Sequence, residues 1–185
     1  MILVIDTSSV RSALALLDGE SVLVEVVKPS GRDFDVAREV LRILPEPGDL
    51  EGVMVALGPG SFTGLRQGIA FGVGMAMSRE VPLLGIGSLE LIRARSPKPA
   101  LAVTEAGRGR AFYLAPDGNR GSAEVADLPG DWPVVGWLKS SIPRLIPDIE
   151  LLSFGHAAVR ARGAAWTVGY GRVKADYMQE FGRLD

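Results

Sequence analysis

The sequence predicts an α/β fold of two lobes, a larger lobe over residues 1–96 and a smaller, less regular lobe over residues 97–185. Three observations carry this prediction. The chain opens with three β-leaning runs, strands and helices alternate after them up to residue 86, and a weaker copy of the opening pattern follows a proline-containing linker. With 185 residues, the chain is long enough for one sizeable domain or for two lobes that share a sheet-based core.

Three strands in an antiparallel meander are predicted for residues 2–28. Residues 2–5 are apolar, residues 12–17 follow a polar turn, and Asp18-Gly19 is a hairpin signal. Valine then recurs at positions 22, 24 and 26, with the period of two that is typical of a strand. The first lobe is therefore expected to begin as an antiparallel sheet.

Helices and strands alternate over the rest of the first lobe. Residues 33–44 predict an amphipathic helix, and residues 64–78 predict a second helix. Residues 53–57 and 82–86 predict strands. A meander followed by right-handed crossovers of this kind is what a ribonuclease-H-like α/β lobe requires.

The first predicted helix has two distinct stripes and a clear end. Pro45 and Pro47 stop it. Its polar stripe is expected to contain Asp35, Arg38, Glu39 and Arg42, and its apolar stripe Phe34, Ala37, Leu41 and Leu44.

The second lobe repeats the opening of the first in weaker form. After a linker at residues 96–99, the segments 102–105 and 112–114 resemble residues 4–7 and 14–16, and an Asp-Gly turn follows each hairpin. The alternative is that any two hairpins align this well. A strand near residues 133–136, a helix near residues 154–162, and core or lobe-packing roles for Trp132, Trp137 and Trp166 complete the expected lobe.

Composition excludes several classes of site. The chain has no cysteine, which rules out disulfides and thiolate chemistry and fits a reducing cytoplasm. Its one histidine, His156, cannot form a paired-histidine metal site, and no metal site is predicted. No apolar run is long enough for a membrane span and no signal peptide is recognised, so a cytoplasmic location without membrane contact is expected. A net charge of −2 provides no general attraction for nucleic acid, and the arginine clusters are expected to be solvated surface.

A glycine-rich loop at residues 57–66 is the most specific motif. It leaves a predicted strand and opens a predicted helix, where backbone N–H groups converge and can hold an anion or another chain. Its spacing matches neither phosphate fingerprint, because a Walker loop needs glycine where Thr63 or Leu65 stands, and Thr63 also interrupts the dinucleotide pattern. The candidate residues for a vestigial phosphate site are Asp6, Thr7, Gly58, Gly60, Ser61, Thr63 and Gly64.

The second predicted helix is apolar almost all round and therefore needs cover on more than one side. The side chains expected to face the sheet are Leu65, Ile69, Val73 and Ala76. A stripe of small residues is expected to admit another helix backbone, either the first helix of the same lobe or a helix of a partner protein, including a second copy of this chain. The expected partner interface contains Arg38, Leu41, Gly68, Phe71, Gly72, Met75, Ala76 and Arg79.

These motifs resemble the TsaB (YeaZ) family, relatives of TsaD within the superfamily of actin-like ATPases, sugar kinases and Hsp70. The resemblance covers roughly residues 1–95 and is carried by Ile5-Asp6-Thr7-Ser8, the glycine loop with Gly68, and Gly85-Ile86-Gly87-Ser88-Leu89. It implies a two-lobed actin-like fold. It also implies a non-catalytic subunit in the formation of N6-threonylcarbamoyladenosine, beside the anticodon of tRNAs that read codons starting with A.

The resemblance implies several partners. TsaD, the transferase, is expected to bind through the helices of the first lobe, and TsaE, an ATPase, is expected to join the complex. TsaC would supply the threonylcarbamoyl-adenylate, and tRNA would be reached indirectly through the complex.

Compared with its catalytic relatives, the chain lacks the residues expected for binding phosphate, magnesium and a further metal ion. Asp6-Thr7-Ser8-Ser9 lacks the glycine of the phosphate-binding turn, and Thr104 stands where an acidic residue would organise magnesium. The helix at 33–44 has no histidine pair for a metal. No catalytic residue and no tightly bound cofactor is therefore assigned to this chain, while the wider complex is expected to use ATP and Mg²⁺. Residues 175–179 also differ from the Pro-x-Tyr-Leu-Arg-like segment that the family leads us to expect.

Two enzymatic hypotheses stay open. A small ATP-binding phosphotransferase or hydrolase of the same superfamily would hold phosphates with Asp6, Thr7 and Ser61. A peptidase is the weaker hypothesis, because His156 is the one histidine, cysteine is absent and no known nucleophile motif occurs.

Overall fold

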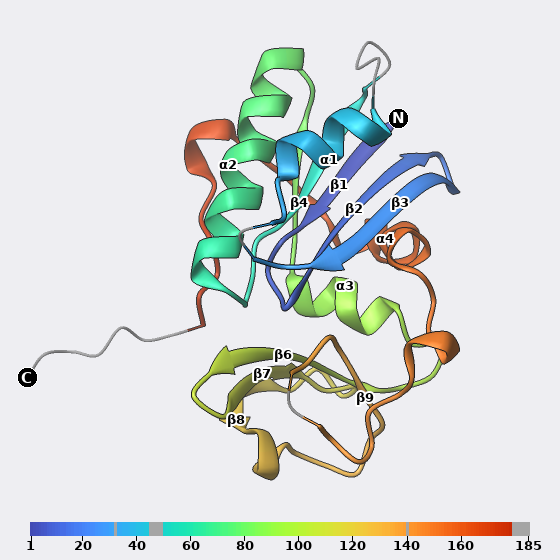
Figure 1. Cartoon of the computed structure of the whole chain (residues 1–185), viewed down its shortest axis with the longest axis vertical. Helices are drawn as coiled ribbons and strands as arrows, with labels where there is room; N and C mark the ends of the chain where they lie inside the picture. Colours follow the sequence, from blue (N-terminus) through green and yellow to red (C-terminus); the bar gives the residue numbers. More distant parts are fainter. Residues whose placement is uncertain (32, 45–49, 140, 179–185) are drawn as a thin grey trace, which may run out of the picture.

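Two β-sheets, one in each lobe, form the framework of the fold (Figure 1). The computed structural model describes residues 1–31, 33–44, 50–139 and 141–178. The first sheet has the strand order β10-β5-β4-β1-β2-β3, and the second has the order β8-β7-β6-β9. The predicted α/β fold of two lobes is confirmed.

The first sheet begins with the predicted meander. Its strands in chain order are β1 (Ile2–Asp6), β2 (Arg11–Asp18), β3 (Ser21–Pro29), β4 (Gly52–Ala56), β5 (Leu83–Ile86) and β10 (Trp166–Val168). The first three pair antiparallel, β4 pairs parallel with β1, and β5 pairs parallel with β4. Because successive side chains of a strand point to opposite faces, Leu3 and Ile5 enter one core while Ile2 and Val4 enter the other.

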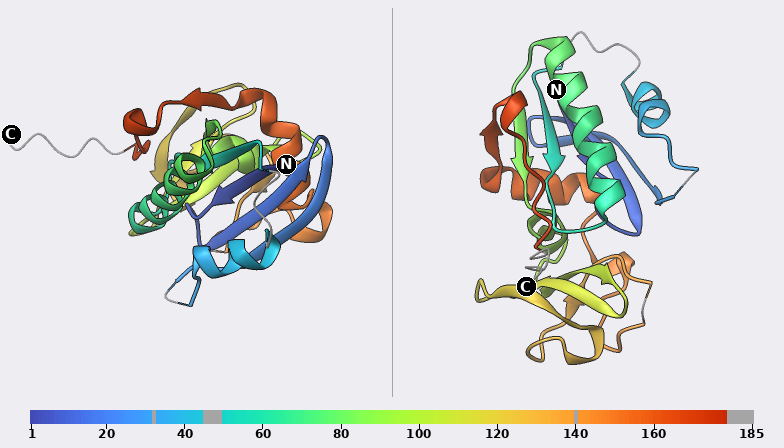
Figure 2. Two further views of the ribbon diagram at one scale, coloured as in Figure 1. Left: turned by 90° about the horizontal axis from the view of Figure 1, so that it is seen from above. Right: turned by 90° about the vertical axis from the view of Figure 1, so that its left-hand side faces the viewer.

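Helices bury both faces of this sheet, as the two views of Figure 2 show. They are α1 (Val36–Ile43), α2 (Phe62–Arg79), α3 (Ser88–Ala94) and α4 (Phe154–Ala161). Helices α1 and α2 pack on one face, α4 packs on the other, and α3 lies between the two lobes. Among the described residues, no helix is long and apolar enough to cross a membrane.

Helix α1 turns a face to the sheet that differs from the predicted one. The helix begins later than expected because the Asp35 carboxylate accepts a hydrogen bond from the Arg38 backbone N–H (3.1 Å). Its buried side chains are Val36, Glu39, Val40 and Ile43, whereas Ala37 and Leu41 are exposed. The prediction is therefore wrong for Ala37, Glu39 and Leu41. The exposed Arg38 and Arg42 and the buried flanking residues Phe34 and Leu44 agree with it. Pro45 and Pro47 lie outside the described residues.

Burial of Glu39 is supported by two cations. Its carboxylate accepts hydrogen bonds from Lys28 Nζ (2.6 Å) on β3 and from Arg42 Nη1 (3.2 Å) on its own helix. The hydrogen bond from Lys28 is the main cause that lowers the pKa of Glu39 below its ordinary value. From periodicity alone, an acidic side chain such as Glu39 is assigned to the surface. Its burial is possible because Lys28 on the adjacent strand β3 compensates its charge.

The second lobe repeats the topology of the first, as predicted. Its strands are β6 (Leu101–Gly107), β7 (Arg110–Leu114), β8 (Arg120–Glu124) and β9 (Val134–Val135). The first three form an antiparallel meander, and β9 pairs parallel with β6 just as β4 pairs with β1. The Asp117-Gly118 turn joins β7 to β8, as Asp18-Gly19 joins β2 to β3.

The chain returns to the first lobe after residue 153, which corrects the expected second-lobe range of residues 97–185. The predicted helix at 154–162 exists as α4, but it packs on β2 and β3. Strand β10 then pairs antiparallel with β5, so Trp166 lies in the first sheet. The physical reason is that one face of the first sheet would otherwise be open, and the apolar side of α4 fills it with Phe154 and Ala158. Short 3-10 helices along the way are η2 (Val125–Asp127), η3 (Asp148–Glu150), η4 (Arg162–Ala164) and η5 (Tyr170–Arg172).

Arg95 shows that an arginine predicted at the surface can be part of the lobe junction. Its exposed fraction is 5%, and its Nη1 lies 3.1 Å from Asp148 Oδ1. Its guanidinium lies 4.6 Å from the ring centroid of Trp137, which in turn packs on Phe154. Trp137 therefore connects the lobes, in agreement with its predicted packing role.

Candidate functional site

Polar groups of the glycine loop form hydrogen bonds with other parts of the chain. Thr7 Oγ1 donates a hydrogen bond to the carbonyl oxygen of Gly64 (2.6 Å), and the Ser61 N–H donates to the carbonyl oxygen of Ser8 (2.6 Å). The Gly58 N–H donates to Ser88 Oγ (3.1 Å). These bonds tie the loop to the turn after β1 and to the start of α3.

Each glycine of the loop is needed because another backbone segment lies against it. A Cβ atom on Gly60 would overlap the Ser8 carbonyl, and one on Gly64 would overlap the Thr7 carbonyl. A Cβ atom on Gly58 would overlap the Asp176 carbonyl. The spacing that matches no phosphate fingerprint is therefore explained by contacts inside this chain.

The predicted phosphate-site residues are divided among several places. Gly60 and Ser61 line a cleft of about 480 Å³ between the lobes, together with Ser8 and with Lys139 of the second lobe. Thr7, Thr63 and Gly64 line a neighbouring hollow of about 440 Å³, and Ser61 borders both. Gly58 lines a third cavity of about 310 Å³. The structure thus brings together part of the set and separates Gly58 from the rest.

Asp6, the last residue of β1, is buried with an exposed fraction of 1%. Its Oδ1 accepts a hydrogen bond from the Ser8 backbone N–H (2.8 Å). Burial raises the pKa of Asp6 above its ordinary value of 3.8, although the Ser8 hydroxyl and N–H oppose this effect. Thr104, at the matching position of β6, is fully buried as well. Across the described ranges, no group of three or more histidine, aspartate or glutamate side chains is placed to hold a metal ion.

Substituting Asp6 with asparagine is expected to stabilise the protein more at high pH than at low pH. A carboxyl whose folded pKa is raised contributes its stability fully below pH 3.8, and that contribution is lost as the pH rises through the folded pKa. Asp6→Asn is neutral throughout, so its melting temperature relative to the unmodified chain should increase from about pH 4 to pH 8. Thermal denaturation over this pH range measures the difference, and a difference that falls with pH would contradict the burial argument.

The small-residue stripe of α2 faces the sheet, so the expectation that it admits another helix is wrong. A Cβ atom on Gly68 would overlap Thr7, and one on Gly72 would overlap Val55. Ala76 has an exposed fraction of 0%. The stripe lets α2 lie close to β1 and β4, because a helix can approach a sheet closely only where its side chains are small. Leu65 is buried, and Ile69 and Val73 pack on the same core, which agrees with their predicted orientation.

The solvent-facing side of α2 is formed by other residues. Ala70 and Gly74 are exposed, and Met77 keeps an exposed fraction of 53%. Phe71 and Met75 are half-buried and pack on the core beside α1. Sequence reasoning missed the exposed set because it counted the glycine stripe as the surface. The signal that could have identified it is Gly74, which lies off the stripe of Gly68 and Gly72.

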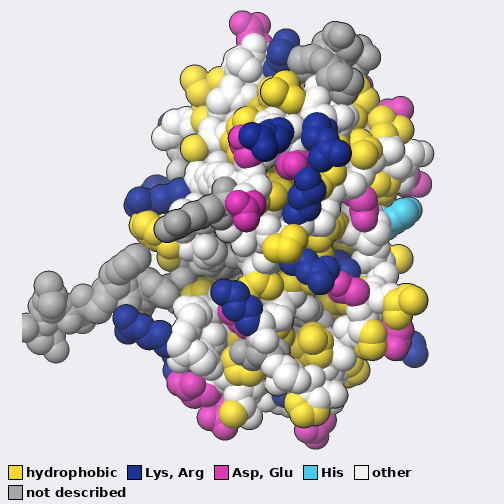
Figure 3. Space-filling view, in the orientation of Figure 1, with side chains coloured by type: hydrophobic (Ala, Val, Ile, Leu, Met, Phe, Trp, Pro, Cys, Tyr) yellow, Lys and Arg dark blue, Asp and Glu magenta, His cyan; other side chains and the backbone are white. Residues whose placement is uncertain are grey.

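The exposed residues of α1 extend this surface. Leu41 has an exposed fraction of 67%, and Arg38 is exposed beside it. Arg79 is exposed in the last turn of α2. Figure 3 shows Lys and Arg side chains gathered over the α1 side of the first lobe, with hydrophobic side chains among them. From the expected interface, Arg38, Leu41 and Arg79 are therefore accessible, whereas Gly68, Gly72 and Ala76 are not.

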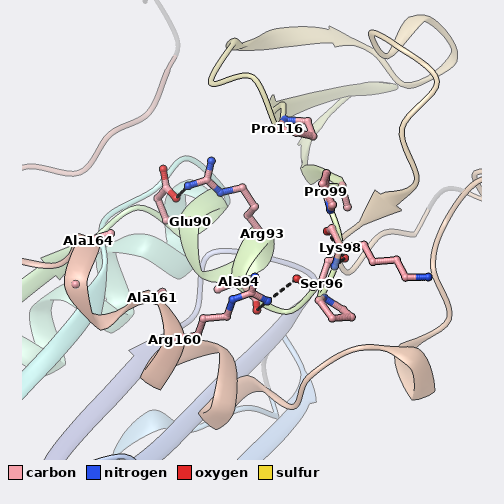
Figure 4. A pocket seen from close by; sticks show the side chains of 13 residues that line it. Glu90, Arg93, Ala94, Ser96, Lys98, Pro99, Pro116, Arg160, Ala161 and Ala164 are labelled. Atoms are coloured by element: carbon pink, nitrogen blue, oxygen red, sulfur yellow. Dashed lines mark hydrogen bonds and ion pairs between the residues drawn. The ribbon is translucent and has the colours of Figure 1, made fainter.

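A further cavity of about 500 Å³ lies between α3, the linker and the end of α4 (Figure 4). Its arginines already have partners. Arg93 pairs with Glu90 (2.6 Å), and Arg160 donates to the carbonyl oxygen of Ser96 (2.6 Å). Lys98 points away from these groups. The cavity contains none of the predicted site residues.

His156 belongs to a hydrogen-bonded helix start. Its Nδ1 lies 2.9 Å from Ser153 Oγ, and Ser153 Oγ donates to Glu25 Oε2 (2.6 Å). The same carboxylate oxygen accepts the Gly155 N–H (2.8 Å) at the first turn of α4. Because the serine proton goes to the carboxylate, His156 Nδ1–H donates to the serine, and the arrangement is the reverse of an activated nucleophile.

Parts of the chain are similar in sequence to known proteins. A family model described as "TsaD: tRNA N6-adenosine threonylcarbamoyltransferase" matches residues 42–127. The chain is 34% identical over 99 residues to the tRNA threonylcarbamoyladenosine biosynthesis protein TsaB of Bacillus subtilis, a match that covers 50% of this chain and 43% of that protein. It is 29% identical over 122 residues to TsaB of Escherichia coli, covering 60% of this chain and 53% of that protein. Over these residues the chain is similar to the TsaB/YeaZ family.

The solved structures extend the TsaB/YeaZ likeness to the whole fold. YeaZ from Pseudomonas aeruginosa superposes with a TM-score of 0.68 at 18% identity, covering 95% of this chain and 98% of that one. A second structure, described as an uncharacterized protein with similarity to peptidase YEAZ from Pseudomonas aeruginosa, has a TM-score of 0.57 and covers 71% of this chain and 69% of that one. In sequence, the matches span only about half the length of the two TsaB relatives.

Proposed function

We propose that this chain is a non-catalytic subunit in the formation of N6-threonylcarbamoyladenosine in tRNA, and that it binds and supports a TsaD-type transferase. The observation that carries the proposal is the likeness to two proteins named for tRNA threonylcarbamoyladenosine biosynthesis. The buried Asp6 and the divided glycine loop support a role other than phosphate chemistry. In the wider complex, TsaE would join as a further partner, ATP and Mg²⁺ would be used there, and tRNA would be reached through the partners.

The partner surface of this proposal is the exposed side of α1 and α2. Met77 and Leu41 are large apolar side chains left in solvent, and Ala70 and Gly74 between them allow close approach of another backbone. Burying a methionine or a leucine in an interface yields roughly 1.5–3 kcal/mol. Arg38 and Arg79 at the rim would add orientation more than affinity.

Replacing Met77 with aspartate is expected to weaken binding of the TsaD protein about 10- to 100-fold, because a buried charge would replace an apolar anchor. Ile149→Asp is the matched control, since Ile149 has an exposed fraction of 94% and lies on η3, away from α2. Isothermal titration of each variant into purified TsaD measures the effect. Equal affinities for Met77→Asp and the unmodified chain would rule out this surface. Light scattering of the unmodified chain and of Met77→Asp tells whether a homodimer forms through the same face.

The pathway assignment has its own test. Threonylcarbamoylation of tRNA, reconstituted from purified components, should fall strongly when this chain is left out. Undiminished modification without it would remove the chain from the pathway, whatever the binding result.

The alternative function is that of a small ATP-binding phosphotransferase or hydrolase. The hydroxyl-lined cleft beside Ser8 and Ser61 is the observation that favours it. Titration of the isolated chain with ATP and Mg²⁺ distinguishes the two hypotheses, because a scaffold subunit should show no tight binding.

A further inference from the structure

The two lobes are joined covalently at one side and touched by a third segment at the other. Residues 95–100 lead into the second lobe, and residues 147–153 lead back. Residues 173–178, here called the strap, run down the opposite side and reach the gap between the lobes (Figure 1). Helix α3 packs on the second sheet beside the first of these crossings, and the strap adds a contact on the opposite side.

The strap holds the glycine loop of the first lobe. The Asp176 N–H donates to the Leu57 carbonyl oxygen (2.6 Å), and the Asp176 carbonyl lies directly against Gly58. One residue further, the Tyr177 ring lies 5.1 Å from the ring of Phe62 at the start of α2. The Arg66 guanidinium packs over the same phenyl ring at 3.8 Å.

The strap also holds the second lobe. Asp176 Oδ2 accepts a hydrogen bond from Arg120 Nη2 on β8 (3.0 Å). Asp176 Oδ1 accepts the Met178 N–H (3.0 Å), and this turn directs Met178 onto the apolar core that includes Phe112 and Leu114. A single residue, Asp176, therefore bonds to both lobes and shapes the chain between them.

The strap divides the space between the lobes. Tyr177 lines the cleft of about 480 Å³, whereas Asp176 and Met178 line the cavity of about 310 Å³ on the other side. Movement of either lobe would have to break the contacts of Asp176 or slide Met178 from its core.

We propose that the strap is an intramolecular clamp that fixes the separation of the two lobes and holds the glycine loop in place. The strap lines both inter-lobe cavities and bonds to the glycine loop through Asp176. The inference concerns this chain alone and does not depend on the proposed partner.

Spin labels on two introduced cysteines can measure the clamp, because the natural chain has no cysteine. Ala70→Cys on α2 and Ala126→Cys in the second lobe place labels on small exposed residues of each lobe. The chain ended after Val173 and the full-length Asp176→Ala variant should both lose the narrow inter-label distance and shift to longer distances. Arg120→Ala should broaden the distribution less, because an exposed ion pair is weak.

Arg110→Ala is the matched control. Arg110 lies on the adjacent strand and pairs with Glu124 (3.3 Å) at similar exposure, without touching the strap. It should leave the distance unchanged. Circular dichroism verifies that each variant is folded, and Asp176→Ala decides the result if the shortened chain does not fold. A narrow, unshifted distribution in folded Asp176→Ala would overturn the clamp.

Discussion

Replacing Gly64 with alanine is expected to destabilise the protein by about 2–3 kcal/mol, whereas the same change at Gly74 should stabilise it by about 0.5–1 kcal/mol. Both glycines lie in α2, so the helix propensity gained is similar. At Gly64 the new methyl group would overlap the Thr7 carbonyl, which belongs to the backbone after β1 and cannot rotate away. At Gly74 nothing lies within 4 Å of the methyl position.

Urea denaturation of the two variants measures this pair of opposite effects. The midpoints should move in opposite directions while the dependence on urea stays the same. Stabilisation by both substitutions would show that helix propensity, and not the packing of the loop on β1, decides the role of these glycines.

Replacing Phe154 with alanine is expected to cost about 3–5 kcal/mol, because it leaves a cavity in a core that the surroundings can fill only in part. Phe154 has an exposed fraction of 2% and packs with Trp137 at a centroid distance of 6.4 Å. It is also the residue that closes the core on the β1 and β2 side of the first sheet. Phe154→Ala should therefore lower the unfolding free energy of the whole first lobe.

Trp166→Ala serves as the comparison for Phe154→Ala. Trp166 lies in the same returning segment, but its exposed fraction is 51%, and its removal should cost clearly less. Thermal and chemical denaturation of both variants provide the values. Equal costs would contradict the placement of α4 in the core of the first sheet.

Much of the fold could be predicted because it rests on local patterns. The three-strand opening, the turn at Asp18-Gly19 and the helix that follows the glycine loop depend on residues close together in the chain. The repeat in the second lobe was visible for the same reason, since it reuses the pattern of a hairpin. The start of α2 at Phe62 differs from prediction by two residues, because Ser61 caps the helix.

The candidate site could be predicted only in part. The glycine loop is the most specific motif of the sequence, and the structure explains its glycines by contacts with other backbone segments. The direction of the stripe on α2 was not predictable, because small residues serve close approach to a sheet as well as to a helix. The exposed set of Ala70, Gly74 and Met77 follows only from knowing which side the strands cover.

The sequence by itself determined the opening meander, strands β4 and β5, helix α2 and the repeat of the hairpin in the second lobe, since each depends on side-chain periodicity within a few residues. It did not predict α3, β8 or β10. Only the tertiary structure decided three features: the return of α4 and β10 to the first sheet, the burial of Glu39, and the strap that joins Asp176 to both lobes. Each depends on residues far apart in the chain. These pairings form because they bury apolar surface and neutralise charges that the local elements leave exposed. Local sequence patterns therefore do not predict them.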